Sequence, residues 1–277
     1  MIYNQITPNV VTTAVSSLEQ IDSLEPKHTI VMTCFVLSGS LIFVDCGEIL
    51  EKAQKFRKDM EEKFQKQTSL LLITHRDGDH YAARDAFKNV DIVTTTSTGE
   101  ITIKSNKKKE AIKKSIMPNI ESKKKENELI IGSKREEIIF REIGGHTADS
   151  ASIYSPRERT LCTGDNLLSC YMQLIRHSGK QFLDAYHYWE NLDIDYVIPG
   201  HGHVVKKEFI TNVRHYIEDD LLPVIERLKG QGLSINKIRR HPDLPSYSLI
   251  SRHLWKKGSV RNERFWRFTI NELYKIV

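Results

Sequence analysis

Four side chains that commonly bind metal ions fall within six consecutive residues of this chain. His75, Asp77, Asp79 and His80 supply two imidazoles and two carboxylates. They directly follow the apolar run 70–73, which predicts a buried strand. Such a cluster at the end of a buried strand needs a cation that offsets its charge and orients its side chains. The segment therefore predicts a metal site.

Three further ligand-type residues occur later in the chain. His146, Asp165 and His201 each directly follow a glycine, and each comes after a predicted strand. Glycine permits tight turns, and loops at one rim of a sheet are where binding sites are usually assembled. Each fragment alone is more often a turn or a packed imidazole. Their joint occurrence favours metal binding, and seven ligands suffice for two adjacent sites, since one site uses three or four.

The elements that must position these residues alternate between strands and helices. Residues 29–37 and 41–46 predict a β-hairpin, and apolar spacing predicts a helix over 49–67. Residues 206–229 have the length of a long helix, which Pro223 could interrupt. This pattern predicts an α/β protein of mixed layers. The other predicted strands cover 90–95, 138–143, 151–154, 160–163 and 196–198, and the other helices cover 81–88 and 181–192.

Composition indicates an ordinary globular chain. It has 277 residues, of which 39% are hydrophobic and 28% charged, and this length is enough for one large domain or for one domain with an appendage. No apolar stretch has the length of a membrane span, and residues 1–15 do not resemble a secretory signal. The four cysteines form no C-x-x-C pair, which favours reduced, buried thiols. We therefore expect no membrane partner and a cytoplasmic location. These cysteines are Cys34, Cys46, Cys162 and Cys170.

The basic charge is concentrated at the end of the chain. Residues 230–277 contain ten Lys and Arg against three Asp and Glu, a net charge of +7, so that residues 1–229 carry −2 of the total of +5. We predict a main domain over 1–229 and a basic helical appendage over 230–277. The appendage would contain helices at 235–240, 246–255 and 264–276. It could bind nucleic acid, although a helical cap over the site is the plainer interpretation; the lysine-rich stretch 104–125 is predicted to be a solvated excursion.

As a set, these motifs resemble the metallo-β-lactamase superfamily of metallohydrolases. The family motif H-x-H-x-D-H matches residues 75–80 except that Asp77 replaces the second histidine, and Gly-His, Gly-Asp and Gly-His pairs follow in the family order. Asp45 resembles the acidic strand end that supports the site in the family. The resemblance covers roughly residues 10–215. It implies a four-layer αβ/βα sandwich of the metallo-β-lactamase type with a small C-terminal helical appendage.

The resemblance also implies roles for the ligands. Asp165 would bridge two metal ions together with a water or hydroxide that attacks a carbonyl or phosphoryl centre. Asp79 would also move a proton, and His203 is a candidate donor to the reacting oxyanion. Two divalent ions are implied, zinc in the first instance, with iron or manganese as alternatives because Asp77 adds a hard oxygen ligand. One ion would be held by His75, Asp77 and His146, and the other by Asp79, His80 and His201.

Several functions remain open at this level. The first hypothesis is a dinuclear hydrolase that acts on a small-molecule ester, thioester or lactone. A metal-dependent nuclease or phosphodiesterase is supported only by the basic C-terminal region and the lysine-rich stretch. A diiron redox protein with a flavodiiron-like site is favoured by Asp77 alone, and the chain lacks a flavodoxin-like domain. A non-catalytic binding module is the fourth hypothesis. The expected partner is a small-molecule substrate, and the sequence is compatible with a homo-oligomer.

Overall fold

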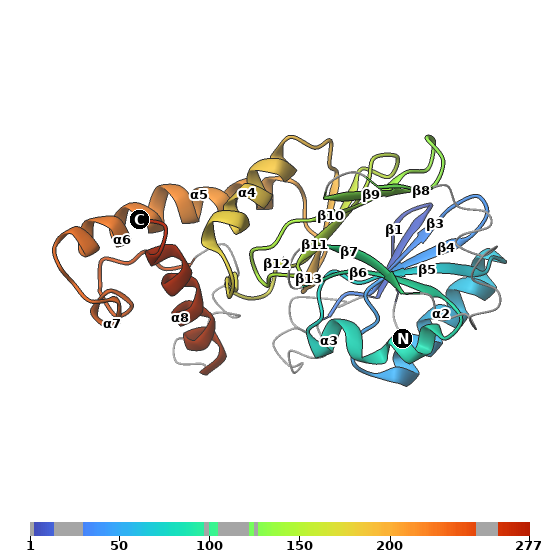
Figure 1. The fold of residues 1–277 in the computed structure, drawn as a ribbon, viewed down its shortest axis with the longest axis horizontal. Coiled ribbons are helices and arrows are strands. Elements are labelled where there is room, and N and C mark those ends of the chain that lie inside the picture. Colours follow the sequence, from blue (N-terminus) through green and yellow to red (C-terminus); the bar gives the residue numbers. More distant parts are fainter. Residues whose placement is uncertain (1–2, 14–29, 97–99, 105–121, 125–126, 248–259) are drawn as a thin grey trace.

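Two β-sheets pack face to face in the computed structural model (Figure 1). The first sheet contains seven described strands in the order β1-β2-β3-β4-β5-β6-β7. They are β1 (Tyr3–Thr7), β2 (Val10–Thr13), β3 (Thr33–Val36), β4 (Leu41–Val44), β5 (Thr68–Leu72), β6 (Asp91–Thr95) and β7 (Ile101–Lys104). The structure describes residues 3–13, 30–96, 100–104, 122–124, 127–247 and 260–277.

The second sheet contains six described strands in the order β13-β12-β11-β10-β9-β8. One hydrophobic core lies between the two sheets, where Phe35 and Leu70 of the first sheet belong to one cluster with Phe140 and Ile153 of the second. The strands are β8 (Ser122–Lys124), β9 (Glu128–Ile131), β10 (Ile138–Glu142), β11 (Ala151–Ser155), β12 (Thr160–Leu168) and β13 (Tyr196–His201).

Helices cover the outer face of each sheet. Helix α2 (Leu50–Phe64) buries Phe56 and Met60 against the first sheet, because these residues recur at helical spacing on one face. Helix α4 (Gly179–Glu190) buries Phe182 and Trp189 against the second sheet. The layers are therefore helix, sheet, sheet and helix, and the predicted αβ/βα sandwich is confirmed.

A nearly continuous helical rod leads away from the second sheet (Figure 1). It consists of α5 (Glu208–His215), a π-helical segment (Tyr216–Leu221) and α6 (Leu222–Gly230). Pro223 lies in the first turn of α6, which begins directly after the π-helical segment. Because a proline has no N–H and crowds the preceding turn, the wider π-helical turn accommodates it without a break.

The C-terminal helices pack back on the rod and on α4. Helix α8 (Val260–Tyr274) buries Ile270 and Leu273 in the same hydrophobic cluster as Trp189 of α4. A small C-terminal helical region is thus present, while the predicted domain boundary at 229/230 stays a prediction. Helix α7 (Ile235–Ile238) replaces the longer helix predicted over 235–240. The predicted helix over 246–255 and the lysine-rich stretch lie mostly outside the described residues.

Parallel pairing brings several strand ends to one rim of the sandwich. Strands β4, β5 and β6 run parallel to one another, as do β12 and β13. The rim is tied across the two sheets, because Ala151 N donates to Thr74 O at 2.7 Å and Val31 N donates to Gly200 O at 3.0 Å. The residues that follow β4 and β5, and the last residue of β13, therefore meet at this rim. No helix in the described part of the chain has both the length and the apolar character needed to cross a bilayer.

Candidate metal centre

All seven ligand-type residues predicted from the sequence meet at this rim, although their local settings differ from the expectation. Asp165 lies inside β12 rather than after a strand, and His201 is the last residue of β13. Asp79 and His80 belong to the short helix α3 (Gly78–Tyr81), which begins within the motif and continues into a 3-10 helix (Ala82–Phe87). The predicted helix after the cluster therefore starts earlier than residue 81.

Two groups of three side chains converge from these elements. In the first group, Asp77 Oδ2 lies 3.7 Å from His75 Nε2 and 3.6 Å from His146 Nε2. In the second group, His201 Nε2 lies 3.2 Å from Asp79 Oδ2 and 3.4 Å from His80 Nε2. The imidazoles are buried and both aspartates are half-buried. Each group therefore gathers one carboxylate and two imidazole nitrogens in a small space.

Asp165 stands between the two groups and turns one oxygen toward each. Its Oδ2 lies 3.9 Å from His75 Nε2 and 3.7 Å from His146 Nε2. Its Oδ1 lies 3.1 Å from His80 Nε2 and 3.5 Å from His201 Nε2. A carboxylate divided in this way has the geometry of a bridging ligand.

The donor set fits divalent metal ions. His75 Nε2 is buried and has no hydrogen-bond partner, and the same is true of Asp165 Oδ1, whose contacts lack hydrogen-bond geometry. Both atoms would be costly to leave without a partner. Two ligands of a tetrahedral zinc ion, each about 2.0–2.2 Å from it, lie roughly 3.3 Å apart, which is close to the separations above. Three sets of potential ligand atoms lie within 4.8 Å of one another, two of them being the groups described above.

Neighbouring groups orient the imidazoles so that Nε2 faces the centre. Asp45, at the end of β4, accepts hydrogen bonds from His80 Nδ1 at 2.7 Å and from Thr74 N and Oγ1, both at 2.8 Å. His146 Nδ1 donates to the carbonyl oxygen of Leu174 at 2.6 Å. Such partners fix the tautomer of a ligand imidazole and leave its other nitrogen free to bind a metal. The supporting role that the sequence predicts for Asp45 agrees with this contact.

The electrostatics of the centre keep its carboxylates ionised. Burial opposes the ionisation of Asp165, but the charges of His201, His80 and His75 outweigh it and hold the pKa well below its ordinary value. Burial likewise opposes ionisation of Asp79, whose pKa is nevertheless lowered to about 2 by its hydrogen bond with His201 and the charge of His80. The centre therefore has a negative charge available for cations.

The imidazoles respond differently to burial. For His146, burial is the dominant effect and lowers its pKa, so that the neutral, ligand form is favoured. For His80, burial lowers the pKa but the charges of Asp165 and Asp45 outweigh it, and the pKa is raised. A cation beside Asp165 would have to compete with this proton.

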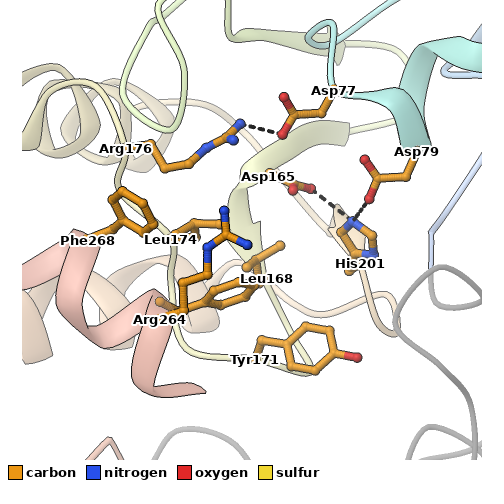
Figure 2. Close-up of a pocket in the computed structure, with 11 residues that line it drawn as sticks. Asp77, Asp79, Asp165, Leu168, Tyr171, Leu174, Arg176, His201, Arg264 and Phe268 are labelled. Carbon is orange, nitrogen blue, oxygen red and sulfur yellow. Dashed lines mark hydrogen bonds and ion pairs between the residues drawn. The ribbon is translucent and has the colours of Figure 1, made fainter. Parts of the chain in front are cut away.

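Arg176 is a site residue that sequence reasoning missed. Its guanidinium donates a hydrogen bond to Asp77 Oδ2 (Figure 2). The same guanidinium lies 3.1 Å from His146 Nε2. The residue lies in the segment between β12 and α4, outside every ligand motif. A single arginine carries no spacing signal, so only its contact with Asp77 identifies it.

A pocket of about 480 Å³ opens in front of the centre. One side carries the aspartates with His201 and Arg176, and the other side is apolar (Figure 2). Helix α8 contributes Phe268 to the apolar side, and it also contributes Arg264, whose guanidinium extends toward the carboxylates in Figure 2. The C-terminal region therefore contributes directly to the site. The remaining lining residues are Leu168, Tyr171, Leu174 and Phe265.

His203 is placed beside the centre rather than in the pocket wall. Its backbone N–H donates to Ser169 Oγ at 2.8 Å, and Ser169 Oγ donates in turn to the carbonyl of His203 at 2.8 Å. Burial lowers the pKa of its imidazole. His203 is not among the described residues that line the pocket, and its catalytic role stays a prediction.

Fold and site together define the class of metallohydrolase-like αβ/βα sandwiches. A model of the Metallo-beta-lactamase superfamily matches residues 33–201, and the chain belongs to this superfamily. No curated protein sequence matches the chain.

Two solved structures share the fold at low sequence identity. One is a double mutant of the sec-alkyl sulfatase PisA1, with a TM-score of 0.62, 12% identity, and coverage of 98% of this chain and 49% of that chain. The other is the stereoselective inverting sec-alkylsulfatase Pisa1 from Pseudomonas sp., with a TM-score of 0.58, 13% identity, and coverage of 99% and 50%. The chain thus spans about half the length of these structures.

Proposed function

We propose that this protein is a dinuclear metal-dependent hydrolase that cleaves a small ester, thioester or lactone. The observation that carries the proposal is the divided carboxylate of Asp165, with one oxygen toward each ligand group. In this proposal one ion would be held by His75, Asp77 and His146 and the other by Asp79, His80 and His201, and Asp165 would be shared. Bound divalent cations would supply Lewis acidity and lower the pKa of a coordinated water.

The residues of the chain have distinct tasks in this proposal. Asp79 is ionised at neutral pH and can accept a hydrogen bond from the attacking water. Through this bond the carboxylate orients the water and can receive its proton. Arg176 holds Asp77 and presents N–H groups to the pocket, where they can bind an oxygen that gains negative charge. The apolar wall of Leu168, Leu174 and Phe268 excludes water from the non-reacting part of the substrate.

A phosphate or sulfate ester is a second candidate substrate class. Arg264 lines the same pocket as the aspartates, and its guanidinium contacts the ring of Phe268 rather than a described carboxylate, so it can receive an anionic group. The alkylsulfatase names of the two structural neighbours agree with an anionic ester, although at 12% and 13% identity they share only the fold. The nuclease or phosphodiesterase alternative belongs to this second candidate, because its substrates are phosphate esters. A diiron redox function rests on Asp77 alone and is our third choice.

Metal analysis combined with a substrate panel tests the proposal. Protein purified without added metal should contain about two equivalents of metal, zinc being the first expectation and iron or manganese the alternatives. It should hydrolyse one or more members of a panel of nitrophenyl acetate, a thioester, a lactone, bis(nitrophenyl) phosphate and nitrophenyl sulfate. A chelator should abolish that activity, and excess metal should restore it.

Matched histidine variants connect the activity to the centre. His146→Ala should reduce metal content and activity by orders of magnitude, because it removes a buried ligand. His215→Ala changes an exposed histidine of α5 and should leave both unchanged. Equal losses in the two variants, or activity that survives complete chelation, would overturn the proposal. The four cysteines are buried and free, which agrees with the reducing, cytoplasmic location that we retain as part of the proposal.

A further inference from the structure

A second pocket, of about 770 Å³, lies on the C-terminal helices and is lined mainly by arginines. Helix α7 and the residues after it contribute Arg239 and Arg240, and α8 contributes Arg264 and Arg267. We call this feature the arginine pocket. Glu263 is the only acidic residue among the described residues that line it. Four arginines and one glutamate are therefore among the residues that line this pocket.

The charges of the arginine pocket are not neutralised by the described part of the chain. None of its four arginines forms an ion pair with a described carboxylate, whereas Arg214 and Arg227 of the adjoining rod pair with Glu190 and Asp243, respectively. Arg239 is held instead by neutral amides, since its Nε donates to Asn271 Oδ1 at 2.9 Å and its Nη1 donates to Asn236 Oδ1 at 3.0 Å. Burial, and then the like charges of Arg267 and Arg240, lower the pKa of Arg239.

Several contacts hold the pocket in a fixed shape. Trp266, which also lines it, donates from Nε1 to the carbonyl oxygen of Arg239 at 2.9 Å. The guanidiniums of Arg264 and Arg267 lie 5.8 Å and 5.6 Å from the ring centre of Phe268. Like charges held together in this way repel one another and lower stability unless an anion binds between them.

Arg264 connects the arginine pocket with the metal centre. It lines both pockets, and in Figure 2 its side chain extends from α8 toward the aspartates. An extended ligand could therefore occupy both pockets at once. Its anionic end would lie among the arginines while its scissile bond lies at the metal centre.

We propose that the arginine pocket binds a phosphate or sulfate group of the substrate, remote from the bond that is hydrolysed at the metal centre. The arginine pocket recognises a tetrahedral oxyanion through the guanidiniums of Arg240 and Arg267. Arg239 holds the pocket in shape. The link to the reacting bond rests on the proposed hydrolase function, whereas anion binding itself does not.

Calorimetric titration of the metal-loaded full-length protein with tripolyphosphate tests this inference. Wild-type protein should bind the probe saturably, and Arg267→Gln should weaken that binding about tenfold or more, since a charge-assisted contact is lost. Arg267 lines only the arginine pocket, so a probe bound at the metal centre would be unaffected by this change. Arg227→Gln is the matched control, because it removes one charge from α6 outside the pocket. The binding constant of Arg227→Gln for tripolyphosphate should differ less than twofold from that of the wild type.

Two results would overturn the inference. One is the absence of saturable binding by wild-type protein, and the other is an equal effect of Arg267→Gln and Arg227→Gln when circular dichroism shows both variants to be folded. Arg240→Gln provides a second variant, and it should reproduce the loss seen with Arg267→Gln. Retained thermal unfolding transitions in the variants exclude misfolding as the cause of a loss.

A second arm of the titration distinguishes the source of the anion. A twelve-nucleotide oligothymidylate should compete with tripolyphosphate in either case; if it binds much more tightly and depends steeply on salt, the phosphate belongs to a nucleic acid. Comparable affinities indicate a small phosphorylated or sulfated molecule. Chelator-sensitive hydrolysis without an Arg267 effect on binding contradicts this inference alone, and anion binding without any hydrolysis contradicts only the proposed function.

Discussion

Arg176 donates a hydrogen bond to Asp77, the carboxylate that stands where the superfamily motif has a histidine. The substitution adds a negative charge to the first ligand group, and Arg176 supplies a nearby positive charge that offsets it. The same guanidinium lies 3.1 Å from His146 Nε2, where it faces the nitrogen that would bind a metal. Arg176 is therefore both a counter-ion for Asp77 and a competitor of a cation in the first group.

Replacing Arg176 should consequently strengthen metal binding at the first group. Arg176→Gln removes the competitor from Asp77 and His146. The side chains of Arg176 and Asp77 are 31% and 35% exposed, so solvent weakens their interaction to about 1 kcal/mol. Its loss should therefore increase the affinity for zinc roughly fivefold. Competition with a chromophoric chelator measures the zinc affinity. Arg159→Gln, which disrupts a surface pair with Asp195, serves as the control. Weaker zinc binding in Arg176→Gln would show that the arginine supports Asp77 as a ligand instead.

Asp45 should control the second group although it lies outside the ligand set. Asp45→Asn removes the carboxylate that accepts from His80 Nδ1 and from Thr74. Loss of such a partner typically lowers metal affinity by about 10–100-fold. Metal content after dialysis and chelator competition measure the effect. Glu48→Gln removes the same charge three residues away at an exposed position and should have no effect. A similar affinity in both variants contradicts the orienting role.

Gly200 should be required for the position of Asp165. A Cβ at this residue would meet the side chain of Asp165 and would lie 2.8 Å from the Gly164 carbonyl carbon and 2.9 Å from Asp165 N. Gly200→Ala should therefore displace the shared carboxylate, abolish most metal binding, and destabilise the protein by about 1–3 kcal/mol through overpacking. Denaturant unfolding and metal analysis measure the two effects.

The matched control for this change is Gly78→Ala. Gly78 also belongs to the ligand region, but a Cβ there meets no atom within 4 Å. Metal content and stability should remain near the wild-type values. If Gly200→Ala is tolerated as well as Gly78→Ala, the close packing of β13 against Asp165 does not position the bridge.

Glu136, which lies outside the metal centre, should make the stability of the protein depend on pH. Burial opposes its ionisation, but hydrogen bonds from Ser38 and the contact with Arg157 outweigh burial and lower its pKa from 4.5. Since the folded-state pKa is lowered, the stabilisation is fully present above the unfolded-state value and is lost as the pH falls through the folded-state value. Urea unfolding between pH 7 and pH 3 should show that Glu136→Gln is less stable at neutral pH and that its difference from wild type shrinks toward acid. A constant difference across this range contradicts the assignment.

The elements of the sandwich were largely predictable because their apolar periodicity is strong. The helix predicted over 49–67 is α2, and the predicted strands 138–143 and 151–154 are β10 and β11. Strands β1 and β2 were not predicted, because such short segments carry little periodic signal in the sequence. They are strands because they pair with each other and with β3 in the first sheet. The extension of β12 through Asp165 was also missed, since its irregular pairing with β13 is a tertiary property.

The residues of the centre were partly predictable for a related reason. Ligand types at fixed spacing after an apolar strand restrict the local chemistry, so His75, Asp79 and His80 could be selected without a structure. Arg176 and Arg264 could not, because arginine is common on every surface and neither belongs to a motif. Their identification depends on the chain segments that carry them reaching the rim of the sandwich.

The sequence by itself determined which side chains leave the strand ends together, because spacing along an extended chain and its turn sets their local direction. Only the tertiary structure decided that the two oxygens of Asp165 face different groups and that α8 brings arginine to the pocket. The physical reason is that these relationships cross between separate layers, whose distance and orientation are set by the packing of the hydrophobic clusters between and outside the sheets.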